Sequence, residues 1–378
     1  MARRCYIGAG GKAKEAQYIY IGIDDVARPV KKCYVGVGGV ARPCWTGLSV
    51  PEYYGTVTGF SARTSAEAAP AGNVLIVAGG KDADGKYLTS AEGINKNLEF
   101  VAVPDLHQAP KANGLSAAST ADYAMFGHGS TASISALSVY DRNLITSVLD
   151  GVGMDGSGAA VSFAKHAIFA GGGVGSTLTV ATVKAVDNNL VVRELADMNY
   201  KRYEHIGVQN GEYALFGGGM RNTASSSTRV KTMDAYDKNF VKAEVEDLSQ
   251  TKRSHVAARA GKYAIIGGGR GDSTSTVYTS TDAYDRNLVK AEVEDFTYKR
   301  YGARGVTIGE CALFGGGMPS SAVPTECYDN KLVKCDAGSI TISGTGRTGI
   351  AAGVIGDYAL FVGGGYSGAT DFCDVFVS

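Results

Sequence analysis

One short segment, an apolar run that ends in glycines, recurs seven times along the chain. The copies are Val74–Gly80, Tyr123–Gly129, His166–Gly173, Tyr213–Gly219, Tyr263–Gly269, Cys311–Gly317 and Tyr358–Gly365. Their last glycines lie 49, 44, 46, 50, 48 and 48 residues apart. A period in the forties has room for four β-strands and is typical of a propeller blade. The sequence therefore predicts seven four-stranded blades.

The four strands of a repeat, named a to d, follow from its residue types. Strand a is small and apolar, as in Gly302–Ile308, and strand b is the run whose glycines let it end close to another backbone. Strand c ends in turns such as Asp285-Arg-Asn287, and Asp and Asn tolerate the positive φ that a tight hairpin requires. Strand d alternates in Phe240–Asp247 and Leu288–Asp295.

The two ends of the repeat array predict how the ring closes. The last repeat stops at strand c, in Asp371–Ser378, and lacks strand d. The segment Tyr54–Phe60 precedes the first strand a and has no other partner. We expect it to supply the missing outer strand of the seventh blade, which would remove the open sheet edges. Residues 51–378 are thus predicted to form one all-β propeller domain.

These residues resemble the kelch family, which includes the central domain of galactose oxidase. The glycine pair after strand b and the Tyr-Asp before the c–d turn carry the resemblance over about 325 residues. Kelch repeats usually have a Trp near strand d, whereas this chain has one Trp, Trp45, outside the predicted ring. We therefore expect Tyr, Phe and Val to pack the blades against one another.

Residues 1–50 form a separate predicted unit with a repeat of period 14. Copies begin at Tyr6, Tyr20 and Tyr34, and alternation around Gly-Gly or Asp-Asp predicts short β-hairpins. Residues 1–45 hold 8 basic and 3 acidic side chains, a net charge of +5. The stretch resembles repeats of tail-associated proteins in prophages of Gram-positive bacteria. That resemblance implies an attachment or oligomerisation element with a virion or baseplate partner, and the alternative is a flexible basic tail.

Basic side chains recur ten to twelve residues before strand b. They are Arg63, Lys111, Arg202, Arg253, Arg300 and Arg347; the third repeat has Asp155 at that position. Because strand a is innermost, its starts would surround the channel mouth, on the same face as the b–c loops. Six cations there would form a positive rim, and Arg grips carboxylates with two hydrogen bonds.

Two interpretations of this rim stay open. In the first it binds an anion or acidic glycan; in the second each cation belongs to the repeat itself and pairs with a neighbouring blade. In the kelch family this face often carries the ligand, which favours the first. His205 and His255 occupy equivalent positions and are secondary candidates. Their alternative role is that of buried polar residues in strand a.

Composition excludes several classes of function. With 37 basic and 37 acidic residues, the chain lacks the net charge that attracts nucleic acid. No run of 18 apolar residues predicts a membrane span, and no apolar stretch near the N-terminus predicts a signal peptide, so we expect a cytoplasmic or virion-associated protein. The seven Cys lack a CxxC pair and are expected to be core residues or free thiols.

The sequence favours a non-catalytic recognition module over an enzyme. It contains no HExxH, GxSxG or P-loop motif, and we expect no cofactor and no bound metal. The predicted partner is a protein or a glycan held on the propeller face, at the head of a phage tail or a similar assembly. Two alternatives remain: a carbohydrate-active enzyme on a kelch scaffold (an oxidase, epimerase or lyase), and a purely structural assembly protein.

Overall fold

The structure is a computed structural model that describes most of the chain. The described residues are 6–9, 12–15, 20–23, 26–29, 32–37, 40–46, 50–110, 115–127, 136–152, 158–173, 179–222, 227–273, 275–319, 324–342, 346–365 and 368–378. Every regular element within these ranges is a β-strand. Accordingly, no helix in this part of the chain is long and apolar enough to cross a membrane.

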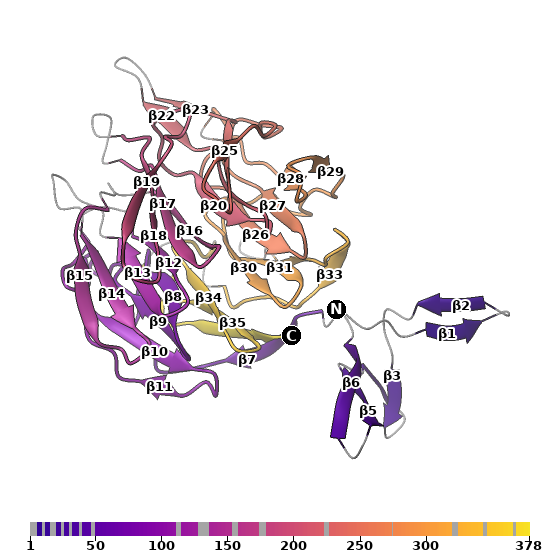
Figure 1. Cartoon of the computed structure of the whole chain (residues 1–378). Helices are drawn as coiled ribbons and strands as arrows, with labels where there is room; N and C mark the ends of the chain where they lie inside the picture. The colour runs from indigo at the N-terminus through magenta and orange to yellow at the C-terminus, as the bar shows by residue number, and fades with distance from the viewer. Residues whose placement is uncertain are drawn as a thin grey trace. The chain divides into compact units, whose positions relative to one another are not determined.

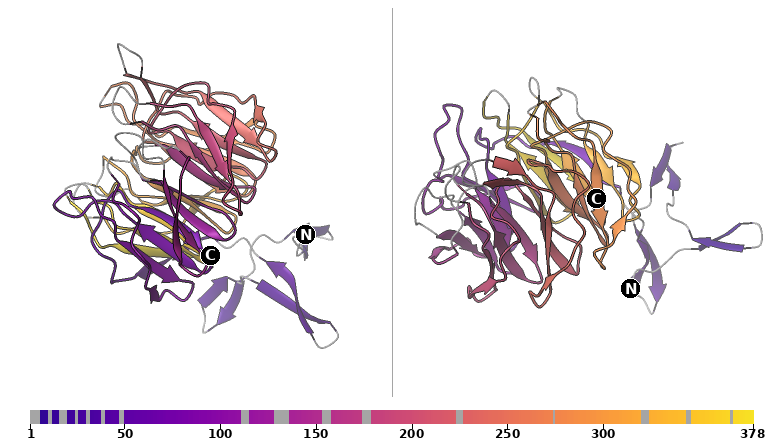
Figure 2. Two further views of the ribbon diagram at one scale, coloured as in Figure 1. Left: turned by 60° about the vertical axis from the view of Figure 1, so that its left-hand side comes forward. Right: turned by 90° about the horizontal axis from the view of Figure 1, so that it is seen from above.

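Residues 51–378 form seven antiparallel four-stranded sheets, which confirms the predicted propeller. Successive blades follow one another around a ring (Figures 1 and 2). Blades one to three are β8 (Glu67–Ala71), β9 (Val74–Ala78), β10 (Ala91–Asn95), β11 (Phe100–Val101); β12 (Ser116–Ser119), β13 (Tyr123–Gly127), β14 (Leu137–Asp141), β15 (Thr146–Leu149); and β16 (Ala159–Phe163), β17 (His166–Ala170), β18 (Val183–Val186), β19 (Val192–Leu195).

Blades four to seven repeat the order, with one added hairpin. They are β20 (Ile206–Gln209), β21 (Tyr213–Gly217), β24 (Met233–Asp237), β25 (Lys242–Ala243); β26 (Val256–Ala260), β27 (Tyr263–Gly267), β28 (Thr281–Tyr284), β29 (Lys290–Ala291); β30 (Arg304–Ile308), β31 (Cys311–Gly315), β32 (Glu326–Tyr328), β33 (Lys334–Asp336); and β34 (Ala351–Ile355), β35 (Tyr358–Val362), β36 (Cys373–Val377), β7 (Glu52–Thr56). The b–c loop of blade four adds the hairpin of β22 (Met220–Asn222) and β23 (Ser227–Arg229).

The seventh blade is closed by a strand from before the first repeat, as predicted. Strand β7, which belongs to the sheet of β34 and β35 (Figure 1), pairs with the last strand, β36. Tyr53 lies opposite Phe376 in this pairing. The strand covers Glu52–Thr56 rather than Tyr54–Phe60, and Val57 adds one more backbone hydrogen bond, to Cys373. Both ends of the array thus share one sheet, which removes an exposed sheet edge.

Two local predictions differ from the structure. The predicted eight-residue d strands shrink to Lys242–Ala243 and Lys290–Ala291, because an outermost strand bonds to one neighbour only and short edges resist aggregation. In the c–d turns, positive φ falls on the third residue after the Asp, such as Leu288 (φ 63°), rather than on Asp or Asn. The Asp285 carboxylate instead accepts hydrogen bonds from the backbone N–H groups of Asn287 and Val289.

Tyrosines of strand c join neighbouring blades, as expected for a ring without Trp. Tyr140, Tyr236 and Tyr328 are fully buried. The hydroxyl of each donates a hydrogen bond to a carbonyl at the end of the previous blade. The three carbonyls are those of Pro104 (2.9 Å), Ala196 (2.8 Å) and Glu294 (2.8 Å). The core is divided into clusters that combine residues of adjacent blades, so neighbouring blades bury apolar surface against one another.

The N-terminal unit, Met1–Val50, consists of three antiparallel hairpins in its described residues. They are β1 (Tyr6–Ala9) with β2 (Lys12–Glu15), β3 (Tyr20–Ile23) with β4 (Val26–Pro29), and β5 (Lys32–Val37) with β6 (Val40–Thr46). The period-14 repeat therefore corresponds to one hairpin per copy, as predicted.

Candidate functional site

Four of the six predicted rim cations are enclosed in the propeller wall. Arg63, Arg202, Arg300 and Arg347 are fully buried. Each pairs with a carboxylate of strand c in its own blade: Glu92, Asp234, Glu326 and Asp374 respectively. The pairing follows the structural interpretation of the repeat, except that the partner lies in the same blade instead of a neighbouring one.

Blade five corrects the alignment of the basic residues. Its buried cation is Lys252, eleven residues before Tyr263, and its ammonium lies 3.4 Å from the Asp282 carboxylate. Arg253 is one position further along and pairs with Glu204 of blade four at 2.7 Å, with 22% of its side chain exposed. Lys111 lies outside the described residues.

Arg347 illustrates how the buried cations are held. Its guanidinium contacts Asp374 and donates hydrogen bonds to four carbonyls. These belong to Gly363 (2.7 Å), Thr341 (3.0 Å), Phe361 (3.0 Å) and Phe372 (2.9 Å). Burial lowers the pKa of Arg347, and Asp374 opposes that shift. The arginine therefore neutralises a buried carboxylate and also donates hydrogen bonds to the carbonyls at the end of strand b.

The backbone of the same residues joins each blade to the one before it. In blade six, the Gly317 N–H donates to the Arg347 carbonyl of blade seven (2.7 Å). A Cβ at Gly316 would lie 2.6 Å from that carbonyl, so only glycine fits. Equivalent bonds link Gly172 to Arg202, Gly219 to Lys252, Gly269 to Arg300 and Gly364 to Arg63. The glycines after strand b and the cation residues of the next blade therefore form one contact between blades, which we call the joint. Both recur because this contact needs both.

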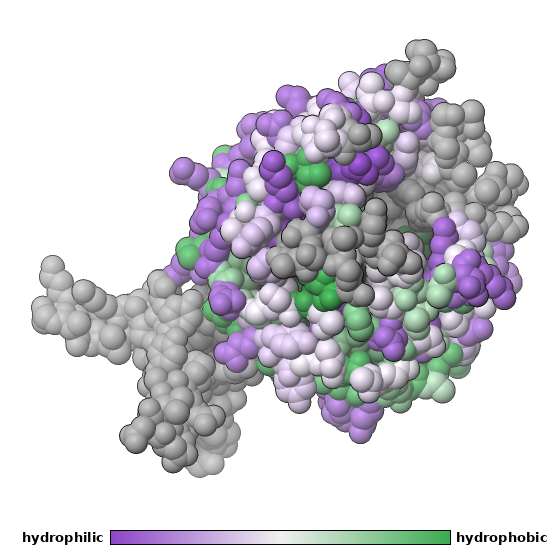
Figure 3. All heavy atoms as spheres, turned by 180° about the vertical axis from the view of Figure 1, so that it is seen from behind, coloured by the Kyte–Doolittle hydropathy of each residue, from purple (hydrophilic) through white to green (hydrophobic). Residues whose placement is uncertain are grey.

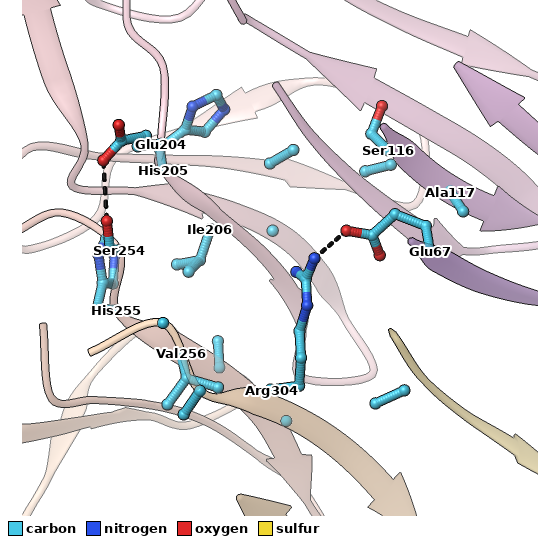
Figure 4. A pocket seen from close by; sticks show the side chains of 18 of the residues that line it. Glu67, Ser116, Ala117, Glu204, His205, Ile206, Ser254, His255, Val256 and Arg304 are labelled. Atoms are coloured by element: carbon cyan, nitrogen blue, oxygen red, sulfur yellow. Dashed lines mark hydrogen bonds and ion pairs between the residues drawn. The ribbon is translucent and has the colours of Figure 1, made fainter. Parts of the chain in front are cut away.

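A cavity of about 390 Å³ lies at the centre of the ring, and residues at or near strand a of all seven blades line it. Most of the lining is Ala, Gly, Ser and Val. Its polar members include Glu67, Glu204, His205, Ser254 and Arg304 (Figure 4). Isolated bridges such as Tyr203–Met220 and Arg253–Arg270 tie the starts of strand a to the starts of the b–c loops, so both lie on one face, as predicted. We call the side of the cavity at which strand a and the b–c loops begin the channel mouth.

Five equivalent residues at the channel mouth have left-handed backbone. Blades six and seven use Gly302 (φ 66°) and Gly349 (φ 65°). Blades one, four and five instead carry Ser65 (φ 59°), Glu204 (φ 51°) and Ser254 (φ 49°). Backbone hydrogen bonds run between some of these residues in adjacent blades, from Ser65 to Gly349 (2.7 Å) and from Gly302 to Ser254 (2.8 Å). Backbone hydrogen bonds thus join the mouth residues of blades one and seven and those of blades five and six.

Charged groups at the mouth form two inter-blade pairs. Glu204 accepts hydrogen bonds from both Arg253 (2.7 and 2.9 Å) and the Ser254 hydroxyl (2.9 Å), as Figure 4 shows for the serine. Arg304 of blade six contacts Glu67 of blade one and donates to the Ile350 carbonyl (2.7 Å). Burial raises the pKa of Glu67, and Arg304 opposes that shift. With 39% of its side chain exposed, Arg304 can still contact a ligand.

The two candidate histidines lie in the cavity wall. Both are neutral and pack between blades. Burial lowers the pKa of both, that of His255 to about 3. The His255 Nε2 lies 3.1 Å from the Gly217 carbonyl, and a Cβ at Gly218 would lie 2.5 Å from the ring. Blade seven has Ile350 at the equivalent position, so residues at this position contribute mainly to packing between blades.

Sequence reasoning did not single out Glu67, Ser65, Glu204, Ser254 or Arg304. For three of them a signal existed: two residues after the buried cation, blades six and seven have Gly and the others do not. Among the described residues, no group of three or more His, Cys, Asp or Glu is arranged to hold a metal ion. No protein-family model and no curated protein matches this chain.

Proposed function

We propose that this chain is a non-catalytic recognition module that binds carbohydrate at the channel mouth. The observation that supports it is the left-handed backbone of Ser65, Glu204 and Ser254. A non-glycine residue in this region costs on the order of 1 kcal/mol, and glycine would remove that cost, as in blades six and seven. Polar side chains kept at three such positions around one cavity indicate that the side chains themselves are used.

The chemistry of the mouth suits a polyhydroxylated ligand. Carboxylate, guanidinium and hydroxyl groups provide both donors and acceptors around a cavity of about 390 Å³, within the size range of small-ligand pockets. The face of the propeller shown in Figure 3 intersperses hydrophilic and hydrophobic residues. The buried Arg63, Arg202, Arg300 and Arg347 are not part of this proposed site.

A triple variant separates binding from folding. Ser65→Gly, Glu204→Gly and Ser254→Gly together remove three polar side chains of the mouth and introduce the residue that blades six and seven have at the same position. We expect glycan binding, measured on an array and then by calorimetry, to be lost. The free energy of unfolding should change by no more than about 1–2 kcal/mol, because relief of strain offsets the lost partly exposed Glu204–Arg253 pair.

The matched control is Lys238→Ala, which removes an exposed ion pair with Glu212 at the c–d turn of blade four. Glycan binding should be unchanged in this variant. Undiminished glycan binding by the triple glycine variant would refute the site. A wild-type protein that binds only proteins, and no glycan, would refute the ligand class.

For the N-terminal unit we propose an attachment or oligomerisation role, supported by its three repeated hairpins and by the resemblance to prophage tail-associated repeats. The test compares the full chain with a chain that begins at Pro51. Light scattering should show a higher mass per particle for the full chain, or the full chain alone should co-purify with tail proteins. Equal mass and equal partners would exclude the role.

A further inference from the structure

Blade six holds three cysteines on three consecutive strands. Cys311 lies on β31, Cys327 on β32 and Cys335 on β33. Cys327 and Cys335 are directly opposite in the antiparallel register, so their side chains share one face. The first two are fully buried within one apolar cluster, and Cys335 packs on its edge, partly exposed.

This arrangement is particular to blade six. At the positions of Cys327 and Cys335, blade four pairs Ala235 with Ala243, and blade five pairs Ala283 with Ala291. Alanine therefore satisfies the packing of both positions in this fold. The thiols of blade six are not required by the repeat.

The accessible thiol is also the most acidic of the three. Hydrogen bonds with the thiols of Cys311 and Cys327 lower the pKa of Cys335 below its ordinary value. By contrast, burial raises the pKa of Cys373 in blade seven to about 12. Cysteines that sense oxidants are accessible, carry a thiolate and lie next to a second thiol that resolves the first product.

We propose that Cys335 and Cys327 form a peroxide-reactive thiol pair that closes to a reversible disulfide. In the first step the Cys335 sulfur attacks the O–O bond of a hydroperoxide, which gives a sulfenic acid and releases water or alcohol. In the second step the Cys327 sulfur forms a bond with the Cys335 sulfur, and the sulfenic oxygen leaves as water. The two thiols lose two electrons, and the hydroperoxide gains them.

The edge position of β33 makes the second step feasible. Opposite Cβ atoms in a sheet lie about 4.5–5.5 Å apart, and a disulfide needs about 3.5–4.5 Å. A movement of about 1 Å is therefore enough. Strand β33 has three residues and bonds to β32 alone, so it can move that far more easily than an inner strand.

The test exposes the full chain to equimolar hydrogen peroxide and maps unreduced tryptic peptides by mass spectrometry. Trypsin cleaves after Lys331 and Lys334, which separates Cys335 from Cys327. The peptide of residues 305–331 holds both Cys311 and Cys327, so its fragment spectrum identifies which of the two is linked to Cys335. We expect a Cys327–Cys335 cross-link that dithiothreitol reverses, while Cys373 stays reduced. In Cys327→Ala, the cross-link should vanish and a dimedone adduct should accumulate on Cys335.

The control variant, Cys373→Ala, should still form the cross-link. Three results would overturn the proposal: Cys335 left unmodified at peroxide levels that oxidise methionine, a wild-type cross-link from Cys335 to Cys311, or a dimedone adduct on wild-type Cys335 without any cross-link. Because Cys327→Ala recreates the residue of blades four and five, a folding defect does not confuse the outcome.

Discussion

Asp374→Asn in blade seven tests whether the buried cations of the repeats stabilise the fold. Asp374 is fully buried and holds the guanidinium of Arg347. It also accepts hydrogen bonds from the Tyr53 hydroxyl (3.0 Å) on the closing strand and from the Thr341 hydroxyl (2.7 Å). An asparagine oxygen can still accept these two bonds, but its amide nitrogen then faces Arg347, so the substitution removes the charge and the acceptor of the ion pair.

The expected loss follows from burial. Removing one member of a buried ion pair leaves the other charge uncompensated and costs about 3–5 kcal/mol. The matched control is Arg253→Met, an arginine of the same segment in blade five whose pair with Glu204 is partly exposed. Partly exposed pairs contribute about 0–1 kcal/mol. Urea unfolding followed by circular dichroism gives both free energies.

A loss below about 1 kcal/mol for Asp374→Asn, equal to that of Arg253→Met, would refute the reasoning. A double variant, Arg347→Met with Asp374→Leu, refines it. The carbonyls of Gly363 and Thr341 would then lose their Arg347 donor, at about 1–3 kcal/mol each, whereas the Phe372 carbonyl keeps the Gly363 N–H. The double variant should therefore stay destabilised by several kcal/mol, unlike ion pairs that hydrophobic residues replace without loss.

Three further predictions concern the joint, the wall and the turns. Gly316→Ala should lower the free energy of unfolding by more than 2 kcal/mol, because its Cβ would lie 2.6 Å from the Arg347 carbonyl, whereas Gly368→Ala, with open space around it, should be neutral in the same urea titration. Because the pKa of His255 in the folded state is about 3, below its ordinary 6.5, the unfolded state binds more protons between these values. Stability should therefore be complete above pH 6.5 and fall as the pH drops toward 3, and His255→Ala should flatten this dependence in thermal melts. Asp285→Ala removes the acceptor of two backbone N–H groups in a c–d turn and should cost about 1–2 kcal/mol by urea unfolding; no measurable loss would contradict the assigned role of the turn.

The repeat predicted the fold because propeller blades are built from local contacts. Six of the seven blades pair only strands that follow one another in the chain, so the glycine-ended runs determine the sheets. The closing strand was also predictable, since Asp371–Ser378 left one edge unpaired. The exact extent of short edge strands was not, because it depends on a few backbone bonds rather than on side-chain pattern.

The candidate site was less predictable than the fold. Counting back from strand b brought Arg253 into the basic set, whereas the structure places Lys252 at the equivalent position. A shift of one residue exchanges a buried side chain for a partly exposed one, since neighbouring side chains on an extended segment face opposite ways. Lys252 is buried against Asp282, and Arg253 reaches the mouth.

The sequence by itself determined the blade count, the manner of closure, the recurring glycines and four of the buried cations. Only the tertiary structure decided that these two signatures form a single joint between blades and that most of the cations are enclosed. The physical reason is distance along the chain. Arg347 meets Asp374 27 residues later, and its carbonyl meets Gly317 30 residues earlier. Whether a charge is buried or exposed depends on those distant partners, which no local pattern records.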